Sequence, residues 1–175
     1  MAYIGALDQG TTSTRFIIFN ELGQIVSQSQ LEHQQILPLA GWVEHDANEI
    51  WANTQKTISA ALSSANISAS ELLAIGITNQ RETTVCWNRN TGEPISNAIV
   101  WQDTRTADYL NSFSDADKET ITKKTGTPIA PYFSASKMAW ILKHEVSDTK
   151  NIAFGTMDSW LVYKLTGEFV TDVTN

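Results

Sequence analysis

The stretch Asp8-Gln9-Gly10-Thr11-Thr12-Ser13-Thr14-Arg15 lies near the start of this chain, between two short apolar segments. Residues 4–7 before its polar centre and residues 15–20 after it are each expected to form a strand, because both runs are apolar and bounded by turn-forming residues. Gly10 suits the turn between them. The sequence therefore predicts a β-hairpin with a polar tip.

The tip of this hairpin has the chemistry of a phosphate site. Backbone N–H groups of a turn can converge on anionic oxygens, and the hydroxyls of Thr11, Thr12 and Ser13 accompany them. Asp8 at the strand end can hold a hydrated Mg²⁺, and Arg15 adds a fixed positive charge. The chain contains no Walker-type loop ending in Lys-Ser or Lys-Thr, so a nucleotide would be held in another way. A bare Asp-x-Gly-Thr string is equally compatible with an ordinary polar turn.

Composition limits the remaining possibilities. The 175 residues are 42% apolar, enough for one globular domain that hides roughly two-thirds of the surface of its unfolded chain. A formal net charge of -7, with no basic run longer than Lys123-Lys124, argues against a nucleic-acid partner. A nucleotide would therefore depend on Mg²⁺ and on individual arginines, for which Arg15, Arg81 and Arg105 are the candidates.

The single cysteine and the absence of long apolar runs bear on location. Cys86 has no partner for a disulfide within these residues, and we expect it to be a small buried residue on a strand. No apolar run approaches the roughly 20 residues that cross a bilayer, and the N-terminus carries no basic targeting segment. These features predict a cytoplasmic protein without membrane insertion.

The pattern of apolar residues in the first half predicts strands followed by a crossover helix. Three antiparallel strands are expected at residues 3–7, 15–20 and 24–32. Asp46 with Glu49 three residues later is the signature of a capping box, so a helix is expected from there to about Ala65. Residues 72–78 form a nearly unbroken apolar run, as expected for a parallel strand buried on both faces.

The second half is expected to add a hairpin and several helices. Two strands at residues 83–88 and 98–101 flank a turn-rich segment and could pair with each other. Helices are expected at residues 104–110, 115–125, 134–144 and from the cap Thr156 to about Leu165, with a short strand at 152–154 and a left-handed stop at Gly167. This order of elements predicts an α/β fold with a mixed sheet and flanking helices.

A second group of polar residues follows the apolar strand. Arg81 and Glu82 come directly after residues 72–78, at the carboxyl end of the strand, where open α/β sheets usually bind ligands. A guanidinium supplies several donors in a fixed fork and a carboxylate accepts several hydrogen bonds, so the pair can bind adjacent hydroxyls of a polyol. Taken alone, an Arg-Glu dipeptide is more simply explained as a surface salt bridge.

The longer strings around these residues resemble one family. Residues 8–15 resemble the first phosphate motif of the actin-like sugar kinases, specifically the FGGY carbohydrate kinases. The resemblance is to the glycerol kinases of that family and covers essentially all 175 residues. The other matching strings are Gly41-Trp42-Val43-Glu44-His45-Asp46, Asn79-Gln80-Arg81-Glu82-Thr83, Val100-Trp101-Gln102-Asp103-Thr104-Arg105-Thr106, Pro131-Tyr132-Phe133-Ser134-Ala135-Ser136-Lys137 and Gly155-Thr156-Met157-Asp158-Ser159-Trp160-Leu161.

This resemblance implies a fold and a set of residue roles. The implied fold is the ribonuclease H-like fold of actin-type ATPases, and residues 1–175 would be most of the N-terminal, glycerol-binding lobe (FGGY_N). The rest of that lobe and the C-terminal nucleotide-binding lobe would lie outside this chain. The resemblance implies that Arg81, Glu82, Trp101 and Tyr132 bind glycerol, that Thr11, Thr12, Ser13 and Arg15 bind the phosphates of ATP or ADP, and that Asp8 lies at Mg²⁺. The other five tryptophans are expected to pack, and the three histidines to be structural or surface residues.

The implied reaction is the ATP-dependent phosphorylation of glycerol to sn-glycerol 3-phosphate, carried out by a homo-oligomeric parent kinase. The catalytic aspartate of glycerol kinases lies further along, in a Gly-Asp-Gln string. We therefore expect no catalytic base in this chain and little activity from it alone. Two alternatives stay open: another FGGY kinase acting on a pentose or another polyol, and a non-catalytic actin-like binding module.

Overall fold

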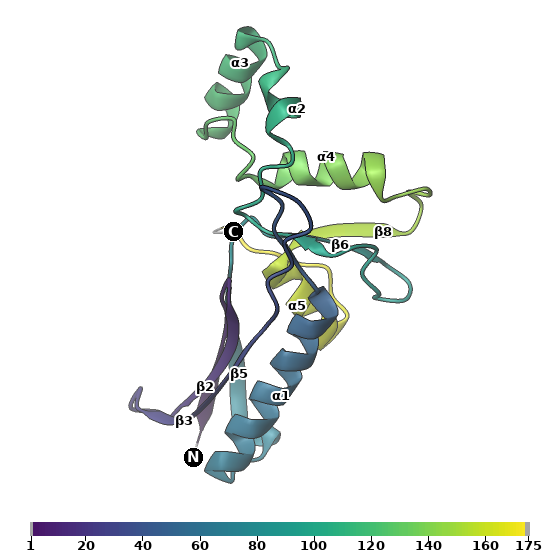
Figure 1. Ribbon diagram of the computed structural model, residues 1–175. Coiled ribbons are helices and arrows are strands. Elements are labelled where there is room, and N and C mark those ends of the chain that lie inside the picture. The colour runs from purple at the N-terminus through teal and green to yellow at the C-terminus, as the bar shows by residue number, and fades with distance from the viewer. Residues whose placement is uncertain (1, 174–175) are drawn as a thin grey trace.

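The structure, a computed structural model, describes residues 2–173. Within those residues the strands form two four-stranded sheets, with the orders β3-β2-β1-β5 and β4-β7-β6-β8 (Figure 1). The strands are β1 (Tyr3–Gln9), β2 (Ser13–Phe19), β3 (Ile25–Glu32), β4 (Glu44–His45), β5 (Leu72–Asn79), β6 (Thr84–Asn88), β7 (Ala98–Ile99) and β8 (Ile152–Thr156). The helices are α1 (Ala47–Ala65), α2 (Ala107–Asn111), α3 (Asp115–Thr125), α4 (Ser134–His144) and α5 (Met157–Thr166), with a 3-10 turn η1 (Ala69–Glu71).

The first sheet is mixed, as predicted. Strands β1, β2 and β3 pair antiparallel, whereas β5 returns through α1 to pair parallel with β1. Helix α1 packs against β2 and β3, where Phe16 and Ile18 meet Ile50 in one apolar core. Because side chains alternate along a strand, Asp8, Ser13 and Arg15 lie on the opposite face of β1 and β2, whereas Gln9 and Thr14 are buried on the face toward α1.

Asp46 caps α1 as predicted, but its reciprocal capping box with Glu49 is not formed. Asp46 is the N-cap, and its side chain accepts the N–H of Asn48 at 2.8 Å. Glu49 instead accepts the backbone N–H of Gln34 at 3.1 Å. The side chain of Glu49 therefore ties the start of α1 to the segment that follows β3.

The prediction that residues 72–78 are buried on both faces is wrong. Strand β5 is largely exposed, with Leu73 73% exposed. It lies at the edge of its sheet, and among residues 2–173 no strand pairs with its outer side. An apolar run predicts burial but does not reveal which element provides it.

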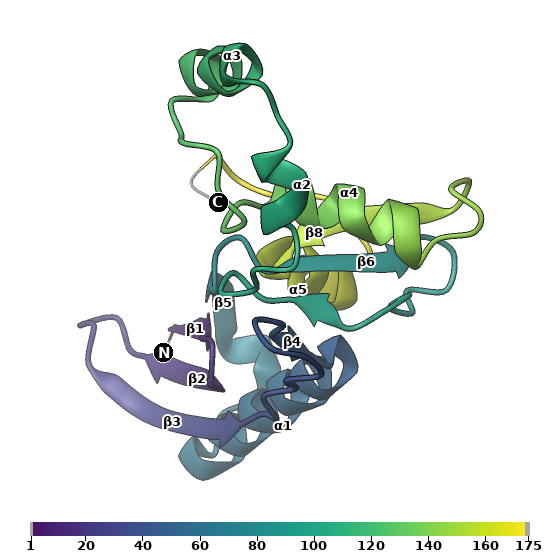
Figure 2. The same ribbon diagram turned by 45° about the horizontal axis from the view of Figure 1, so that its top comes forward.

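The second sheet is covered on both faces, by α4 and α5 (Figure 2). Val85 and Trp87 of β6 pack toward Trp160 of α5, while Cys86 between them packs toward Ile141 of α4. Burial raises the pKa of the Cys86 thiol to about 11. The predicted pairing of β6 with β7, the burial of Cys86 and the packing role of the two tryptophans are all confirmed.

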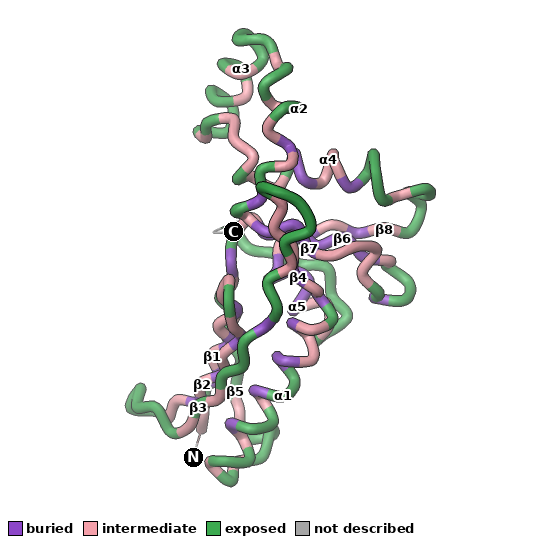
Figure 3. The backbone as a smooth tube through the Cα atoms, viewed as in Figure 1, coloured by how far each residue is buried: buried purple, intermediate pink, exposed green. Residues whose placement is uncertain are grey.

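The predicted helices are found with small shifts at their ends. Helix α5 begins after Thr156 and ends at Gly167, whose φ of 82° is the expected left-handed stop. The Thr156 hydroxyl donates to the carboxylate of Asp158, and it accepts no backbone N–H as a capping side chain would. Helices α2 and α3 project from the body, and α3 contains no buried residue (Figures 1 and 3). Within the part of the chain described, no helix combines the length and apolar character needed to cross a bilayer.

Candidate functional site

The tip of the β1–β2 hairpin presents backbone donors. The N–H of Gly10 donates to the carbonyl of Ser13 at 2.9 Å and closes the turn. The carbonyl of Thr11 accepts from the ring of His33 and from the side chain of Gln35, both at 3.0 Å, and the carbonyl of Thr12 accepts the N–H of His33. Among residues 2–173 no group accepts the N–H of Thr11 or Thr12. Two N–H groups are therefore available for an anion at the predicted phosphate site.

The histidines behind this turn contribute no positive charge. Burial lowers the pKa of His33 below its usual value and lowers the pKa of His45 to about 3. Their rings meet edge to face with centroids 4.5 Å apart. Both rings are neutral near pH 7, so they serve as hydrogen-bonding supports of the turn, consistent with the predicted structural role.

The charged residues of the hairpin lie on the sheet face away from α1. Asp8 and Arg15 are directly opposite each other on β1 and β2, and both are half-buried. The side chain of Gln30 on β3 accepts from Arg15 at 2.8 Å and donates to the hydroxyl of Ser13 at 3.0 Å. The carboxylate of Asp8 makes no hydrogen bond or ion pair with any residue between 2 and 173, so it is free to act on a ligand.

Three of the four predicted polyol residues line one hollow. The hollow has a volume of about 300 Å³ and is bounded by Asn79, Gln80, Arg81, Trp101 and Tyr132. The rings of Trp101 and Tyr132 meet nearly edge to face, with centroids 5.8 Å apart. The hollow thus combines the donors of Arg81 with two aromatic surfaces, as a ligand with both hydroxyl groups and carbon atoms requires.

Glu82, the fourth predicted polyol residue, is held beside this hollow by the start of α4. Its carboxylate oxygen Oε2 accepts the backbone N–H of Ser134 at 2.8 Å and the Ser134 hydroxyl at 2.7 Å. The buried ammonium of Lys137 donates to the carbonyl of Glu82 at 3.3 Å and to that of Tyr132 at 2.5 Å. Burial lowers the pKa of Lys137 to about 8, although the carboxylates of Glu82 and Asp103 act to raise it.

A continuous chain of hydrogen bonds joins the hairpin to the hollow. The indole N–H of Trp101 donates to the hydroxyl of Thr11 at 3.0 Å, and the backbone N–H of Trp101 donates to the hydroxyl of Thr83 at 3.2 Å. Thr83 donates in turn to the side-chain oxygen of Gln80 at 2.9 Å, and the amide of Gln80 donates to Gln9 at 2.9 Å. The predicted phosphate and polyol groups are therefore parts of one site.

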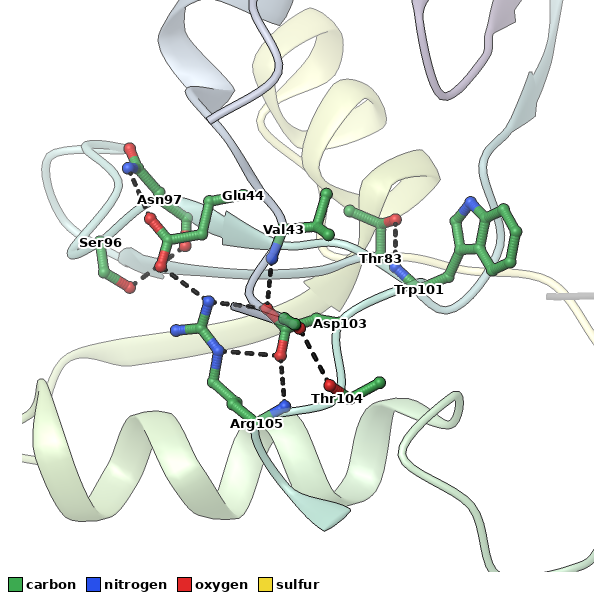
Figure 4. A network of polar contacts seen from close by, with 10 residues as sticks. Val43, Glu44, Thr83, Ser96, Asn97, Trp101, Asp103, Thr104 and Arg105 are labelled. Carbon is green, nitrogen blue, oxygen red and sulfur yellow. Dashed lines mark hydrogen bonds and ion pairs between the residues drawn. The ribbon is translucent and has the colours of Figure 1, made fainter. Parts of the chain in front are cut away.

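Arg105 does not belong to this site, contrary to the expectation that it serves a nucleotide. Its guanidinium lies 2.7 Å from Glu44 and 2.8 Å from Asp103, and its side chain is only 2% exposed (Figure 4). It also lies over the ring of Trp42, 3.8 Å from the centroid. Asp103 in addition accepts the N–H of Val43 at 2.7 Å. Arg105 thus anchors the segment around residues 42–44 to the loop after β7.

Three further residues support the predicted polyol residues and were given no role from the sequence: Gln80, Ser134 and Lys137. Each lies within a string that resembles the family and that also contains an assigned residue, which is the signal that could have drawn attention to them. Their bonding could not be predicted, because it depends on how β5, α4 and the hairpin meet in space.

The chain is similar in sequence and in structure to known proteins. The model of the FGGY family of carbohydrate kinases, N-terminal domain, matches residues 3–175. A glycerol kinase of Pseudarthrobacter chlorophenolicus is 52% identical over 184 residues, which cover 99% of this chain and 36% of that protein. A Plasmodium falciparum glycerol kinase with ADP matches with a TM-score of 0.87 and 35% identity, covering 95% of this chain and 35% of that one. A gluconate kinase from Lactobacillus acidophilus shares the fold, with a TM-score of 0.86 and 24% identity over 99% of this chain and 35% of its own. The chain thus spans little more than a third of these proteins.

Proposed function

The chain belongs to the FGGY family of carbohydrate kinases, and we propose that the protein containing it transfers the γ-phosphoryl group of ATP to glycerol, giving sn-glycerol 3-phosphate and ADP. Its mixed α/β architecture is the ribonuclease H-like fold of this family, as the sequence predicted. In this proposal residues 1–175 are most of the N-terminal lobe. The rest of that lobe and the nucleotide-binding lobe lie outside them, in keeping with the 36% of the related glycerol kinase that the chain spans.

The observation that carries this proposal is the hydrogen bond between Trp101 and Thr11. It places the wall of the polyol hollow directly against the phosphate hairpin, at 3.0 Å. Phosphoryl transfer depends mainly on positioning the acceptor hydroxyl in line with the γ-phosphate and on neutralising charge. The contact between the two groups supports this proposal, because it brings the polyol hollow next to the hairpin proposed to hold the phosphates.

The free N–H groups of Thr11 and Thr12 would bind phosphate oxygens, with the hydroxyl of Ser13 and the guanidinium of Arg15 beside them. This assignment accounts for two backbone donors that have no acceptor among residues 2–173. Backbone N–H groups in a tight turn form an anion site without any net positive charge. Such a site suits a chain whose net charge is -7.

Asp8 would hold Mg²⁺, because its carboxylate is half-buried and engaged by no protein group among the described residues. Those residues include no cluster of three or more His, Cys, Asp or Glu side chains that could enclose a metal. Mg²⁺ in nucleotide enzymes is typically bound by one or two carboxylates together with phosphate oxygens and water, so the single carboxylate fits this ion. When bound, the ion neutralises charge on the phosphates.

Glycerol would lie in the hollow between Arg81 and the rings of Trp101 and Tyr132. Arg81 donates to hydroxyls, and Oε1 of Glu82, which receives no donor from residues 2–173, accepts from one. The two rings cover the carbon atoms of the substrate. The resemblance assigns the base that orients the attacking hydroxyl to a Gly-Asp-Gln string, which residues 1–175 do not contain.

The experiment that tests this function is coupled ADP release by the purified whole protein with glycerol, xylulose or gluconate as acceptor. Glycerol is the expected acceptor, because the chain is 52% identical to a glycerol kinase and only 24% identical to the gluconate kinase. A strong preference for xylulose or gluconate would overturn the choice of glycerol. ATP binding without turnover on any polyol would favour a non-catalytic module. Light scattering on the same protein tests the homo-oligomer that the resemblance implies, and fractionation of cells that produce the protein tests the cytoplasmic location predicted from the sequence.

A further inference from the structure

The backbone of Glu82 is strained. Its φ is 65°, and among the described residues Asn66 is the only other non-glycine residue with positive φ. Asn66 occupies the C-cap of α1, a position where asparagine adopts this conformation readily. Glu82 has no such local reason. A left-handed residue of this kind costs free energy and persists only where surrounding contacts hold it.

Those contacts come from the first turn of α4. The N–H and the hydroxyl of Ser134 both donate to Oε2 of Glu82, at 2.8 and 2.7 Å, so this oxygen is occupied and the carboxylate cannot rotate freely. The other oxygen, Oε1, receives no donor from residues 2–173. Ser134 therefore determines which carboxylate oxygen remains for a ligand.

Lys137, one turn further along α4, holds the backbone at Glu82 and at Tyr132. Its ammonium donates to the carbonyl of Glu82 at 3.3 Å and to the carbonyl of Tyr132 at 2.5 Å. The residue is 0% exposed and does not line the hollow. A buried lysine is costly, and this one joins two segments that are fifty residues apart in the sequence.

We propose that Lys137, together with Ser134, is a positioning residue of the polyol site: it holds Glu82 and Tyr132 in the one relative geometry in which both contact the substrate. This rests on the proposed function, because it takes Glu82 and Tyr132 as polyol-contacting residues. Lys137 itself touches no substrate and acts only through the two main-chain carbonyls. Within residues 2–173 neither Lys137 nor Ser134 forms a hydrogen bond with the hairpin at residues 8–15.

The test compares Lys137→Met with Lys143→Met in the whole protein, by coupled ADP release. Methionine is unbranched and nearly as long, but it removes the donor to the carbonyl of Tyr132 and one of the donors to the carbonyl of Glu82. We expect the KM for glycerol to rise about tenfold or more and the KM for ATP to change by less than about twofold. Lys143 is exposed on the same helix, so its replacement should change neither value. Equal changes in both KM values, or an unchanged KM for glycerol, would overturn the proposal.

If Lys137→Met does not fold, Ser134→Ala provides a second test of the same proposal. It removes one of the two donors to Oε2 and should raise the KM for glycerol roughly threefold to tenfold while the KM for ATP stays constant. An unchanged KM for glycerol would again count against the positioning role. If the wild-type protein phosphorylates another polyol, the proposed function is wrong, and the same variants measured with that polyol still decide the role of Lys137.

Discussion

The indole N–H of Trp101 donates a hydrogen bond to the hydroxyl of Thr11 across 3.0 Å, although the two residues are 90 positions apart in the sequence. Thr11 lies at the tip of the hairpin that we propose to bind phosphate, and Trp101 forms a wall of the hollow that we propose to bind glycerol. The bond fixes the distance between the two halves of the site. It also gives the phosphate and polyol halves a shared group through which occupancy of one can alter the other.

A double-mutant cycle should detect this bond in the whole protein. Trp101→Phe removes the donor but keeps an aromatic wall, and Thr11→Val removes the acceptor but keeps the shape. We expect the double variant to lose less than the sum of the single losses in kcat/KM for glycerol, with a coupling of about 1 kcal/mol, or about fivefold. Strictly additive losses would mean that the bond contributes nothing to the reaction.

Replacement of Arg81 should weaken the use of glycerol specifically. Arg81→Ala removes charged donors from the hollow, and a hydrogen bond to a charged group is worth about 1.5 to 3 kcal/mol. We therefore expect kcat/KM for glycerol to fall about tenfold to several hundredfold, with a raised KM. Arg89→Ala, at an exposed arginine outside the hollow, is the control. An unchanged KM for glycerol would show that Arg81 is an ordinary surface-loop residue that does not bind the substrate.

Replacement of Asp8 should lower mainly activity, whereas replacement of Asp46 should lower mainly stability. Asp8→Asn leaves the packing of the hairpin intact but weakens the proposed Mg²⁺ site, so kcat should fall far more than the thermal midpoint. Asp46→Ala removes the N-cap of α1 and should cost about 1 kcal/mol of stability with little change in kcat. Calorimetry and ADP release on both variants give the comparison. Parallel losses of kcat and thermal midpoint in Asp8→Asn would make Asp8 mainly structural.

Local signals predicted local structure well in this chain. Asp46 begins α1 and Gly167 ends α5 as expected, because a cap depends on a few neighbouring residues. The hairpin at residues 8–15 and the grouping of Arg81 with Trp101 also followed from the sequence, the latter through the family resemblance.

The predictions that failed concern residues whose burial depends on elements distant in the sequence. The apolar residues of β5 predicted a strand covered on both faces, but β5 lies at a sheet edge. Arg105 appeared to be an available cation, yet Glu44 of the distant strand β4 and the nearby Asp103 neutralise it. The burial of Lys137 was not predicted, because it depends on the approach of α4 to the loop after β5. Each case depends on tertiary contacts that no local pattern encodes.

The pKa of Lys137 predicts a measurable pH dependence of stability. Burial lowers this pKa from 10.5 to about 8 in the folded chain, against the opposing effect of Glu82 and Asp103. Between these pH values the unfolded chain binds more protons than the folded chain, so this group makes the free energy of unfolding rise with pH, by roughly 3 kcal/mol in total. Urea unfolding at several pH values should show the wild type gaining stability relative to Lys137→Met above pH 8. Parallel curves for the two proteins would contradict the lowered pKa.

The 175-residue chain on its own is expected to fold but to show little turnover. One apolar core runs through both sheets, joining Leu7 and Phe16 of the hairpin to Trp87 and Trp160, so the chain has the means to fold cooperatively. Activity requires closure of a complete site, and the chain spans only 36% of the related glycerol kinase. The exposed edge of β5, with Leu73 73% exposed, also favours weak self-association. Calorimetry with glycerol, light scattering and a sensitive ADP-release assay on the purified chain measure these properties. Glycerol-dependent turnover near that of the whole protein would show that the base assigned outside this chain is dispensable, and the mechanism proposed for the site would then be wrong.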